Sequence, residues 1–256
     1  MPECYAAADG VLGVLHTRTL ESSPLPRLIN TARFVVDVMS PGAMAPEGRG
    51  IRSAQWVRWL HAMVRRHVKP AGGWDTTRAV AINQEHMAGT LVAFSQVSLD
   101  AMAKLGVEIG PSDMEAYVHA WSVVGHLLGV RDENLPRSVS EARSLVGAIR
   151  RRTHRPSTEG RDLLAALLRF AESRFPPPVR GLPAELVRYL VPETTAEILG
   201  LRPSTRARHL VAALRLGFRV RERVTRRFPP ARALDLYNRR RFVEAVLWIE
   251  GRALSR

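Results

Sequence analysis

Apolar side chains recur every three or four positions along most of this chain, which is the spacing of amphipathic helices. Alternating runs of β-branched residues, which are typical of strands, are almost absent. The pattern predicts helices over residues 27–39, 51–68, 84–105, 112–128, 139–152, 161–175, 184–199, 206–227 and 231–254. We therefore predict an all-α protein with a single globular domain of about eight to ten helices.

Residues at the expected helix ends agree with this pattern. Asn83 can cap the helix that starts at residue 84, and Gly106 can end it. Segments 112–115 and 138–141 each begin with Ser and end with Glu, which is the spacing of a capping box. Three consecutive prolines, residues 176–178, form the clearest break. They divide the chain into a helical core, residues 1–175, and a basic helical segment, residues 176–256, which we expect to pack on the core.

The chain has a formal net charge of +14, and its basic excess lies mostly near the C-terminus. Only Lys69 and Lys104 are lysines, and such a preference for arginine is what a GC-rich genome produces. Residues 201–256 contain 15 arginines and four acidic residues, which accounts for +11 of the net charge. We expect solvated helix faces there, with an anionic partner or a membrane surface as the alternative. Sequence-specific nucleic-acid binding is not expected, because the segment lacks a helix-turn-helix signature and interleaved aromatic residues.

Several common functions find no support in the sequence. There is no window of about 18 uncharged apolar residues that would predict a membrane-spanning helix. The N-terminus lacks the pattern of a signal peptide, and the single cysteine fits a reducing compartment, so we expect a cytoplasmic protein. Zinc-finger spacings, HExxH, GxGxxG, Walker and GxSxG motifs do not occur, which leaves conventional nucleotide and serine-hydrolase chemistry without support.

The helix predicted over residues 51–68 carries the most informative cluster of side chains. Arg58, His61 and Arg65 fall within roughly 60° of one another on this helix. An apolar stripe runs beside them, formed by Val57, Leu60, Val64 and Val68. The imidazole is therefore expected at the edge of a core-facing surface, between two guanidinium groups that favour its neutral form. Haem suits such a helix, because His61 can ligate the iron while Arg58 and Arg65 pair with its carboxylates. A structural histidine at the core edge is the simpler alternative.

Two other pairs of polar residues share helix faces. His119 and His126 lie seven residues apart around Trp121, so they can form part of a non-haem metal site or simply mark a helix contact. Arg27 and Thr31 lie four residues apart, on a helix whose other face is apolar.

Four motifs, in the order RLxxT…FVxDVM, RWLHAMVR, AINQEHMAGTLVAFS and YVHAWSVVGHLLGV, extend from about Arg27 to Val130. Together they resemble the catalytic domain of the rubber oxygenase (latex-clearing protein) family, also called the ER-bound oxygenase family. The resemblance implies a haem b protein with a globin-like helical core within residues 1–175. Well-studied members of this family use dioxygen to cleave double bonds of polyisoprene. By this resemblance His61 is the proximal iron ligand and Arg58 and Arg65 support haem binding. Arg27 and Thr31 then lie near the cofactor on the opposite wall, as catalytic residues.

The chain departs from the family pattern in three places. Asn30 stands where rubber oxygenases have a lysine that can occupy the sixth iron position, so no lysine ligand is expected. The catalytic glutamate upstream of the arginine has no convincing match, Asp9 and Glu21 being the nearest acids, which leaves the general base open. Only 26 residues precede Arg27, so part of the distal wall is expected to be missing.

The leading hypothesis from the sequence is thus a haem-dependent oxygenase-like protein that acts with dioxygen on a small apolar or lipid-like molecule. It can require a redox partner that the sequence does not identify. The alternative is a non-enzymatic helical protein of the same origin that binds an anionic partner or a membrane surface through its Arg-rich C-terminal segment.

Overall fold

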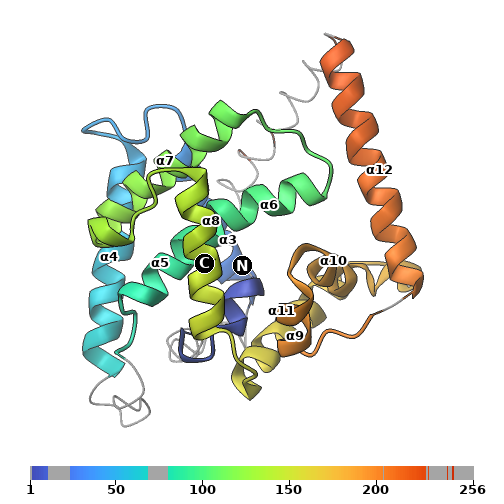
Figure 1. Cartoon of the computed structure of the whole chain (residues 1–256), viewed down its shortest axis with the longest axis horizontal. Coiled ribbons are helices and arrows are strands. Elements are labelled where there is room, and N and C mark those ends of the chain that lie inside the picture. Colours follow the sequence, from blue (N-terminus) through green and yellow to red (C-terminus); the bar gives the residue numbers. More distant parts are fainter. Residues whose placement is uncertain are drawn as a thin grey trace.

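The computed structural model describes residues 2–10, 24–68, 80–203 and 205–228, together with residues 230, 241 and 244. Within these ranges the chain forms ten α-helices and three short 3₁₀ helices, and no strand (Figure 1). The only extended pairing there is an isolated bridge between Ala7 and His154. The prediction of an all-α protein is confirmed.

The helices and their bounds, in chain order, are η1 Pro2–Ala6, α3 Pro24–Met39, α4 Arg49–Val68, α5 Gln84–Phe94, α6 Gln96–Lys104, α7 Pro111–Leu128, η2 Asp132–Asn134, α8 Val139–Thr153, α9 Thr158–Glu172, η3 Pro177–Val179, α10 Leu182–Leu190, α11 Glu193–Ile198 and α12 Thr205–Arg227. The predicted helix 231–254 lies outside the described residues.

The first half of the chain forms the main helix bundle. Helices α3 and α4 are consecutive and pack against each other, and α7 packs on α4 and on α5. Helix α8 covers the other side of α5, so α5 lies between neighbours on both sides (Figure 1). The apolar centre of this bundle joins three of these helices through Val38, Leu91, Trp121 and Val124. Burial of these large side chains supplies most of the driving force for assembling the bundle.

A second apolar cluster joins the N-terminal 3₁₀ helix to helices near the C-terminus. Tyr5 and Ala6 of η1 pack against Leu163 and Leu164 of α9 and against Leu199, which follows α11. Helix α10 packs on α9 and, more extensively, on α12. These contacts join residues before and after position 175, so α9 packs with the helices that follow it. The division of the chain into a core, residues 1–175, and a basic segment, residues 176–256, remains a prediction.

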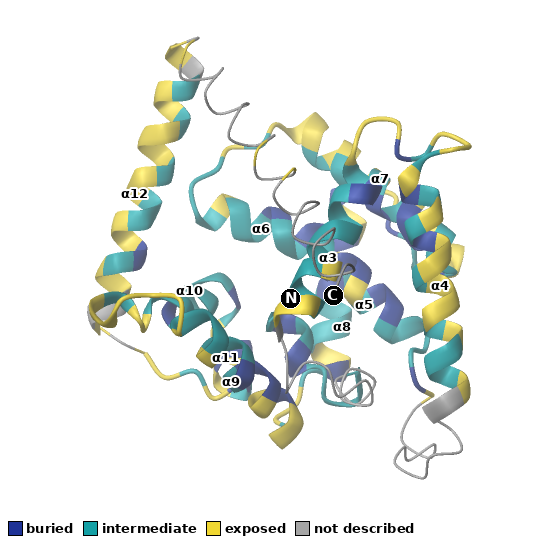
Figure 2. Ribbon diagram, turned by 180° about the vertical axis from the view of Figure 1, so that it is seen from behind, coloured by how far each residue is buried: buried dark blue, intermediate teal, exposed yellow. Residues whose placement is uncertain are grey.

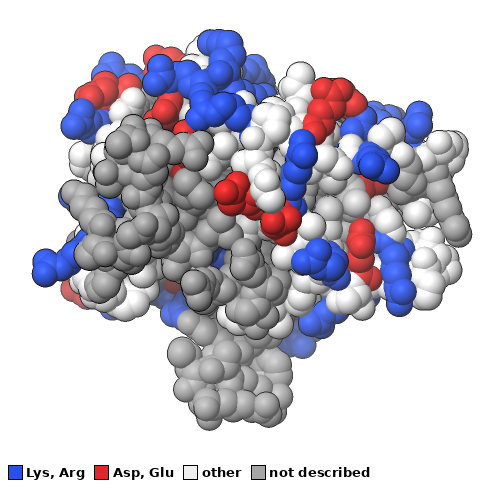
Figure 3. Space-filling view, turned by 90° about the horizontal axis from the view of Figure 1, so that it is seen from below, with Lys and Arg blue, Asp and Glu red and all other residues white. Residues whose placement is uncertain are grey.

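Helix α12 lies at one side of the molecule, and α4 lies at the opposite side (Figure 1). Much of the surface of α12 is exposed (Figure 2). Among the described residues, no helix is both long and apolar enough to cross a membrane. Basic and acidic side chains are interspersed on the face shown in Figure 3.

Several predicted helix ends are confirmed. The Asn83 side chain accepts a hydrogen bond of 2.9 Å from the backbone N–H of His86, and Ser138 caps α8 by accepting from the N–H of Glu141. Gly106 has a φ of +89°, a left-handed conformation that glycine adopts without strain at a helix end.

Three other predictions about the helices were wrong. Helix α7 begins at Pro111 with no side-chain cap, and the carboxylate of Glu115 accepts instead from the distant N–H of Val139. The helix predicted over 84–105 breaks at Ser95, whose hydroxyl donates to the carbonyl of Leu91 and so competes for a helical acceptor. The helix predicted over 184–199 divides before Pro192, because proline cannot continue the hydrogen-bond ladder.

Candidate functional site around His61

The side chain of His61 lies on the side of α4 that faces the protein interior. The inward positions follow helical spacing from the buried Ala54 through Val57 to His61 and Val64, the last three being half-buried. Leu60, expected on the core-facing stripe, is 43% exposed. The prediction that Leu60 faces the core was wrong, because the side of α4 that faces the core is centred closer to His61. His61 therefore lies within the inward stripe instead of at its edge.

The imidazole of His61 is neutral and carries an unused ring nitrogen. Its Nδ1 is buried and has no hydrogen-bond partner in the part of the chain that the structure describes. Burial, together with the nearby positive charge of Arg65, lowers the pKa of His61 from 6.5 to about 4. A buried nitrogen without a partner is unusual and energetically costly. A neutral imidazole with an unused nitrogen is also the form that ligates a metal.

Arg65 fixes the entry to α5. Its guanidinium donates to the carbonyl oxygen of Ile82 at 3.0 Å and approaches the sulfur of Met87 at 3.9 Å. Ile82 has a φ of +50°, which is strained for a β-branched residue. The arginine thereby holds a strained turn immediately before the Asn83 cap.

Arg58 lies over the C-terminal end of α7. Its guanidinium donates to the carbonyl of Leu127 at 3.3 Å and packs beside Gly129, where a positive charge interacts favourably with the helix dipole. The side chain of Gln84 joins the same corner, because it donates to the carbonyl of Gly129 at 2.9 Å and accepts from the N–H of Arg131. Both arginines therefore brace neighbouring helices through backbone carbonyls. Each guanidinium has five N–H donors, so this bracing leaves donors for a carboxylate.

Arg27 and Thr31 are half-buried on successive turns of α3. Burial lowers the pKa of Arg27, and its charge interacts with the phenol of Tyr5 in η1. Burial raises the pKa of Tyr5 to about 12, against the opposing influence of Arg27. The structure thus places Arg27 beside η1. Its position with Thr31 across a cofactor from His61 remains a prediction.

Asp37, which is not among the site residues predicted from the sequence, ties α3 to α4. Its side chain is only 4% exposed, and it accepts a 2.6 Å hydrogen bond from the hydroxyl of Ser53. The guanidinium groups of Arg33 and Arg49 approach the same carboxylate at 3.4 and 3.3 Å. The available signal was a lone carboxylate within the apolar run FVVDVM, because a buried charge requires partners.

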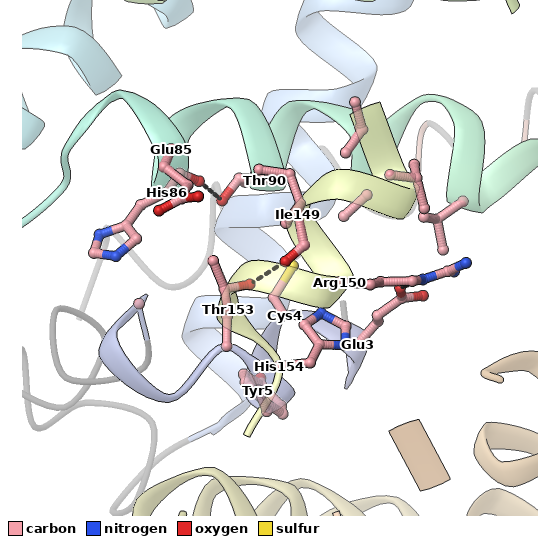
Figure 4. Close-up of a pocket in the computed structure, with 17 residues that line it drawn as sticks. Glu3, Cys4, Tyr5, Glu85, His86, Thr90, Ile149, Arg150, Thr153 and His154 are labelled. Atoms are coloured by element: carbon pink, nitrogen blue, oxygen red, sulfur yellow. Dashed lines mark hydrogen bonds and ion pairs between the residues drawn. The ribbon is translucent and has the colours of Figure 1, made fainter. Parts of the chain in front are cut away.

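A separate pocket lies on the other side of α5. Figure 4 shows that η1, α5 and the C-terminal end of α8 contribute its labelled lining residues, which are Glu3, Cys4, Tyr5, Glu85, His86, Thr90, Ile149, Arg150, Thr153 and His154. Its cavity volume is about 100 Å³. Ligand pockets commonly occupy about 300–1,000 Å³, so this pocket as described is too small for haem.

The polar groups of this pocket are mostly engaged or neutral. The buried carboxylate of Glu3 pairs with Arg150 at 2.6 Å through one oxygen. Burial raises the pKa of the Cys4 thiol, which keeps it protonated and weakly nucleophilic. Burial also lowers the pKa of His86 and of His154, despite carboxylates near each ring that act in the opposite direction. The geometry gives no support for thiolate or acid–base catalysis there.

The alternative metal site at His119 and His126 is not supported. Both side chains are exposed, and Nδ1 of His126 pairs with Asp132 at 3.1 Å on the surface. In the described parts of the chain, no three His, Cys, Asp or Glu side chains are grouped closely enough to hold a metal ion.

Comparison with known proteins extends the resemblance beyond the four motifs. Residues 3–245 match the family described as "ER-bound oxygenase mpaB/B'/Rubber oxygenase, catalytic domain". The chain belongs to this family. The match covers both halves of the chain, whereas the sequence motifs alone extended only from about Arg27 to Val130.

Two relatives show the extent of the similarity within this family. The rubber oxygenase of Streptomyces sp. (strain K30) is 27% identical over 189 residues, which are 73% of this chain and 46% of that protein. The chain therefore spans about half the length of this curated relative. A solved structure of latex clearing protein LCP in the closed state superposes with a TM-score of 0.64 at 24% identity. That superposition covers 86% of this chain and 66% of the other, and it confirms the predicted fold.

Proposed function

We propose that this protein is a haem b-dependent oxygenase that acts with dioxygen on an apolar or lipid-like small molecule. Membership of the oxygenase family supports the reaction class. The observation that carries the haem assignment is the buried Nδ1 of His61, which has no partner among the described residues. A cytoplasmic location and a redox partner remain predictions.

The side chains around His61 fit haem better than a metal ion held by protein ligands alone. A porphyrin would supply four nitrogen ligands, so the protein would need to add only one further ligand. His61 offers one neutral imidazole on the inward face of α4, between apolar neighbours at positions 57 and 64. Arg58 and Arg65 flank it with cationic groups that suit the two carboxylates of haem b.

Haem, when bound, would supply the iron at which dioxygen is activated. The chain's own residues would hold and orient it. The bond from Arg65 to the Ile82 carbonyl and the bond from Arg58 to the Leu127 carbonyl hold α4 against its neighbours, which would fix the backbone that carries His61. Arg27 would contribute a half-buried positive charge that stabilises negative charge developing in the reaction, and Thr31 would offer a hydroxyl one turn away.

The experiment is a visible absorption spectrum of the full chain, recorded after expression with haem supply and after titration with hemin. We expect a Soret band that saturates at one haem per chain in the wild type and is lost in His61→Ala. His126→Ala is the matched control, because this exposed histidine should leave the band unchanged. A wild type that never acquires a Soret band, or a His61→Ala variant with an unchanged band, would overturn the proposal.

A second variant separates loss of the ligand from loss of the fold. His61→Gly leaves space for free imidazole, which should restore a Soret band if the ring acts as the axial ligand. Circular dichroism of the same samples reports whether the helices are intact. A folded His61→Gly protein that retains the wild-type spectrum without imidazole would show that another residue binds the iron.

A further inference from the structure

The outer face of α4, opposite the side that carries His61, exposes large apolar side chains. Trp56 is 62% exposed, Trp59 is 51% exposed and Leu60 is 43% exposed. Their spacing of three and four residues forms one stripe along the helix. The two indole rings stack with centroids 4.9 Å apart, so together they present one continuous apolar surface. We call these three residues the α4 outer stripe.

The charge of α4 is entirely positive. Its sequence RGIRSAQWVRWLHAMVRRHV contains five arginines and no acidic residue. Arg52 and Arg66 are exposed on the side of the helix that carries the stripe, one before it and one after it. Arg49 and Arg65 are instead engaged with Asp37 and with the Ile82 carbonyl. The two exposed cations therefore flank an apolar surface without a neutralising carboxylate on the helix.

We propose that the α4 outer stripe docks the protein on an anionic membrane surface, with Trp56 and Trp59 in the headgroup region and Arg52 and Arg66 on lipid phosphates. Tryptophan favours this interface because its ring is apolar and its N–H is polar. An apolar face beside basic residues is typical of helices that lie in the plane of a membrane. His61 is about 140° around the helix from Trp56, so docking leaves the haem side of α4 facing the protein.

Two observations favour a membrane over a protein partner. The exposed apolar side chains stand beside arginines on a helix without an acidic residue, which suits the anionic headgroups of lipids. A second copy of a chain with a net charge of +14 would also bring like charges together. The Arg-rich α12 also exposes apolar residues, which are Leu216, Val220 and Val224, but it has no tryptophan. This helix is the competing surface in the experiment.

The experiment measures co-sedimentation of the full chain with phosphatidylcholine vesicles, with and without phosphatidylglycerol, at about 0.1 M ionic strength. We expect binding to the anionic vesicles and a drop of at least about tenfold in partitioning for the Trp56→Ser/Trp59→Ser variant. Arg52→Gln/Arg66→Gln should weaken binding by about fivefold for each lost charge. In the wild type, vesicles should shift the tryptophan emission to the blue, and the double serine variant should lose most of this shift.

Matched variants test whether the effect is specific to α4. Leu216→Ser/Val220→Ser alters the α12 surface, and Val123→Ser replaces an apolar residue that is 37% exposed on α7. Both should bind like the wild type, and circular dichroism checks that every variant is folded.

No vesicle binding by the wild type, unchanged binding by the double serine variant, or loss only in the α12 variant would each overturn the proposal. A wild-type dimer that the double serine variant converts to a monomer would assign the stripe to a protein contact instead. The assay needs neither haem nor activity, so its failure leaves the proposed function standing.

Discussion

Replacing Asp37 with alanine should loosen the pairing of α3 with α4, the two helices that carry Arg27, Thr31 and His61. The Ser53 hydroxyl donates to the buried carboxylate at 2.6 Å, a charged hydrogen bond that is worth about 1.5–3 kcal/mol. Arg33 and Arg49 are 33% and 53% exposed, so each adds only about 0.5 kcal/mol. Removing the carboxylate also removes the free-energy cost of burying its charge, and this gain offsets part of the loss. We therefore expect Asp37→Ala to lower the free energy of unfolding by about 2–3 kcal/mol.

The assay is urea denaturation followed by circular dichroism, in a double-mutant cycle with Ser53→Ala. The coupling energy between Asp37 and Ser53 should be about 1.5–2 kcal/mol, because this is the shortest contact in the cluster. Asp37→Asn keeps an acceptor for the hydroxyl and should lose about 1 kcal/mol. A loss below about 1 kcal/mol in Asp37→Ala, or no coupling to Ser53, would refute the argument that this carboxylate joins the two helices.

Two further predictions concern η1 and its neighbours. Burial raises the pKa of Tyr5 from 10 to about 12, so the folded state favours the neutral phenol. The resulting contribution to the free energy of unfolding, at most about 3 kcal/mol, is complete below pH 10 and is lost as the pH rises from 10 to 12. Unfolding free energies measured across this range should fall less steeply in Tyr5→Phe, and equal slopes would contradict the assignment. A Cβ at Gly160 would overlap the backbone carbonyl of Tyr5, so Gly160→Ala should cost about 2 kcal/mol or more in thermal unfolding. Gly217→Ala, on an open face of α12, should instead stabilise by up to about 1 kcal/mol, and similar effects at the two glycines would show that packing on η1 is not tight.

The sequence by itself was sufficient for features that depend on neighbours along the chain. The 3.6-residue period located the helices because burial of one face is a local pattern, and the Asn83 and Ser138 caps follow from contacts three residues away. His61 with its two arginines was recognisable for the same reason, since all three lie on one helix.

The tertiary structure decided what these residues touch. Arg58 contacts a carbonyl 69 residues away and Asp37 is joined to a hydroxyl 16 residues away, and no local period encodes such partners. The rotation that exposes Leu60 and turns His61 inward depends on how α4 packs against α3 and α7. The sequence therefore singled out a histidine suited to bind a metal. Packing between distant helices decided that its ring is neutral and that its Nδ1 is buried without a hydrogen-bond partner in the described chain.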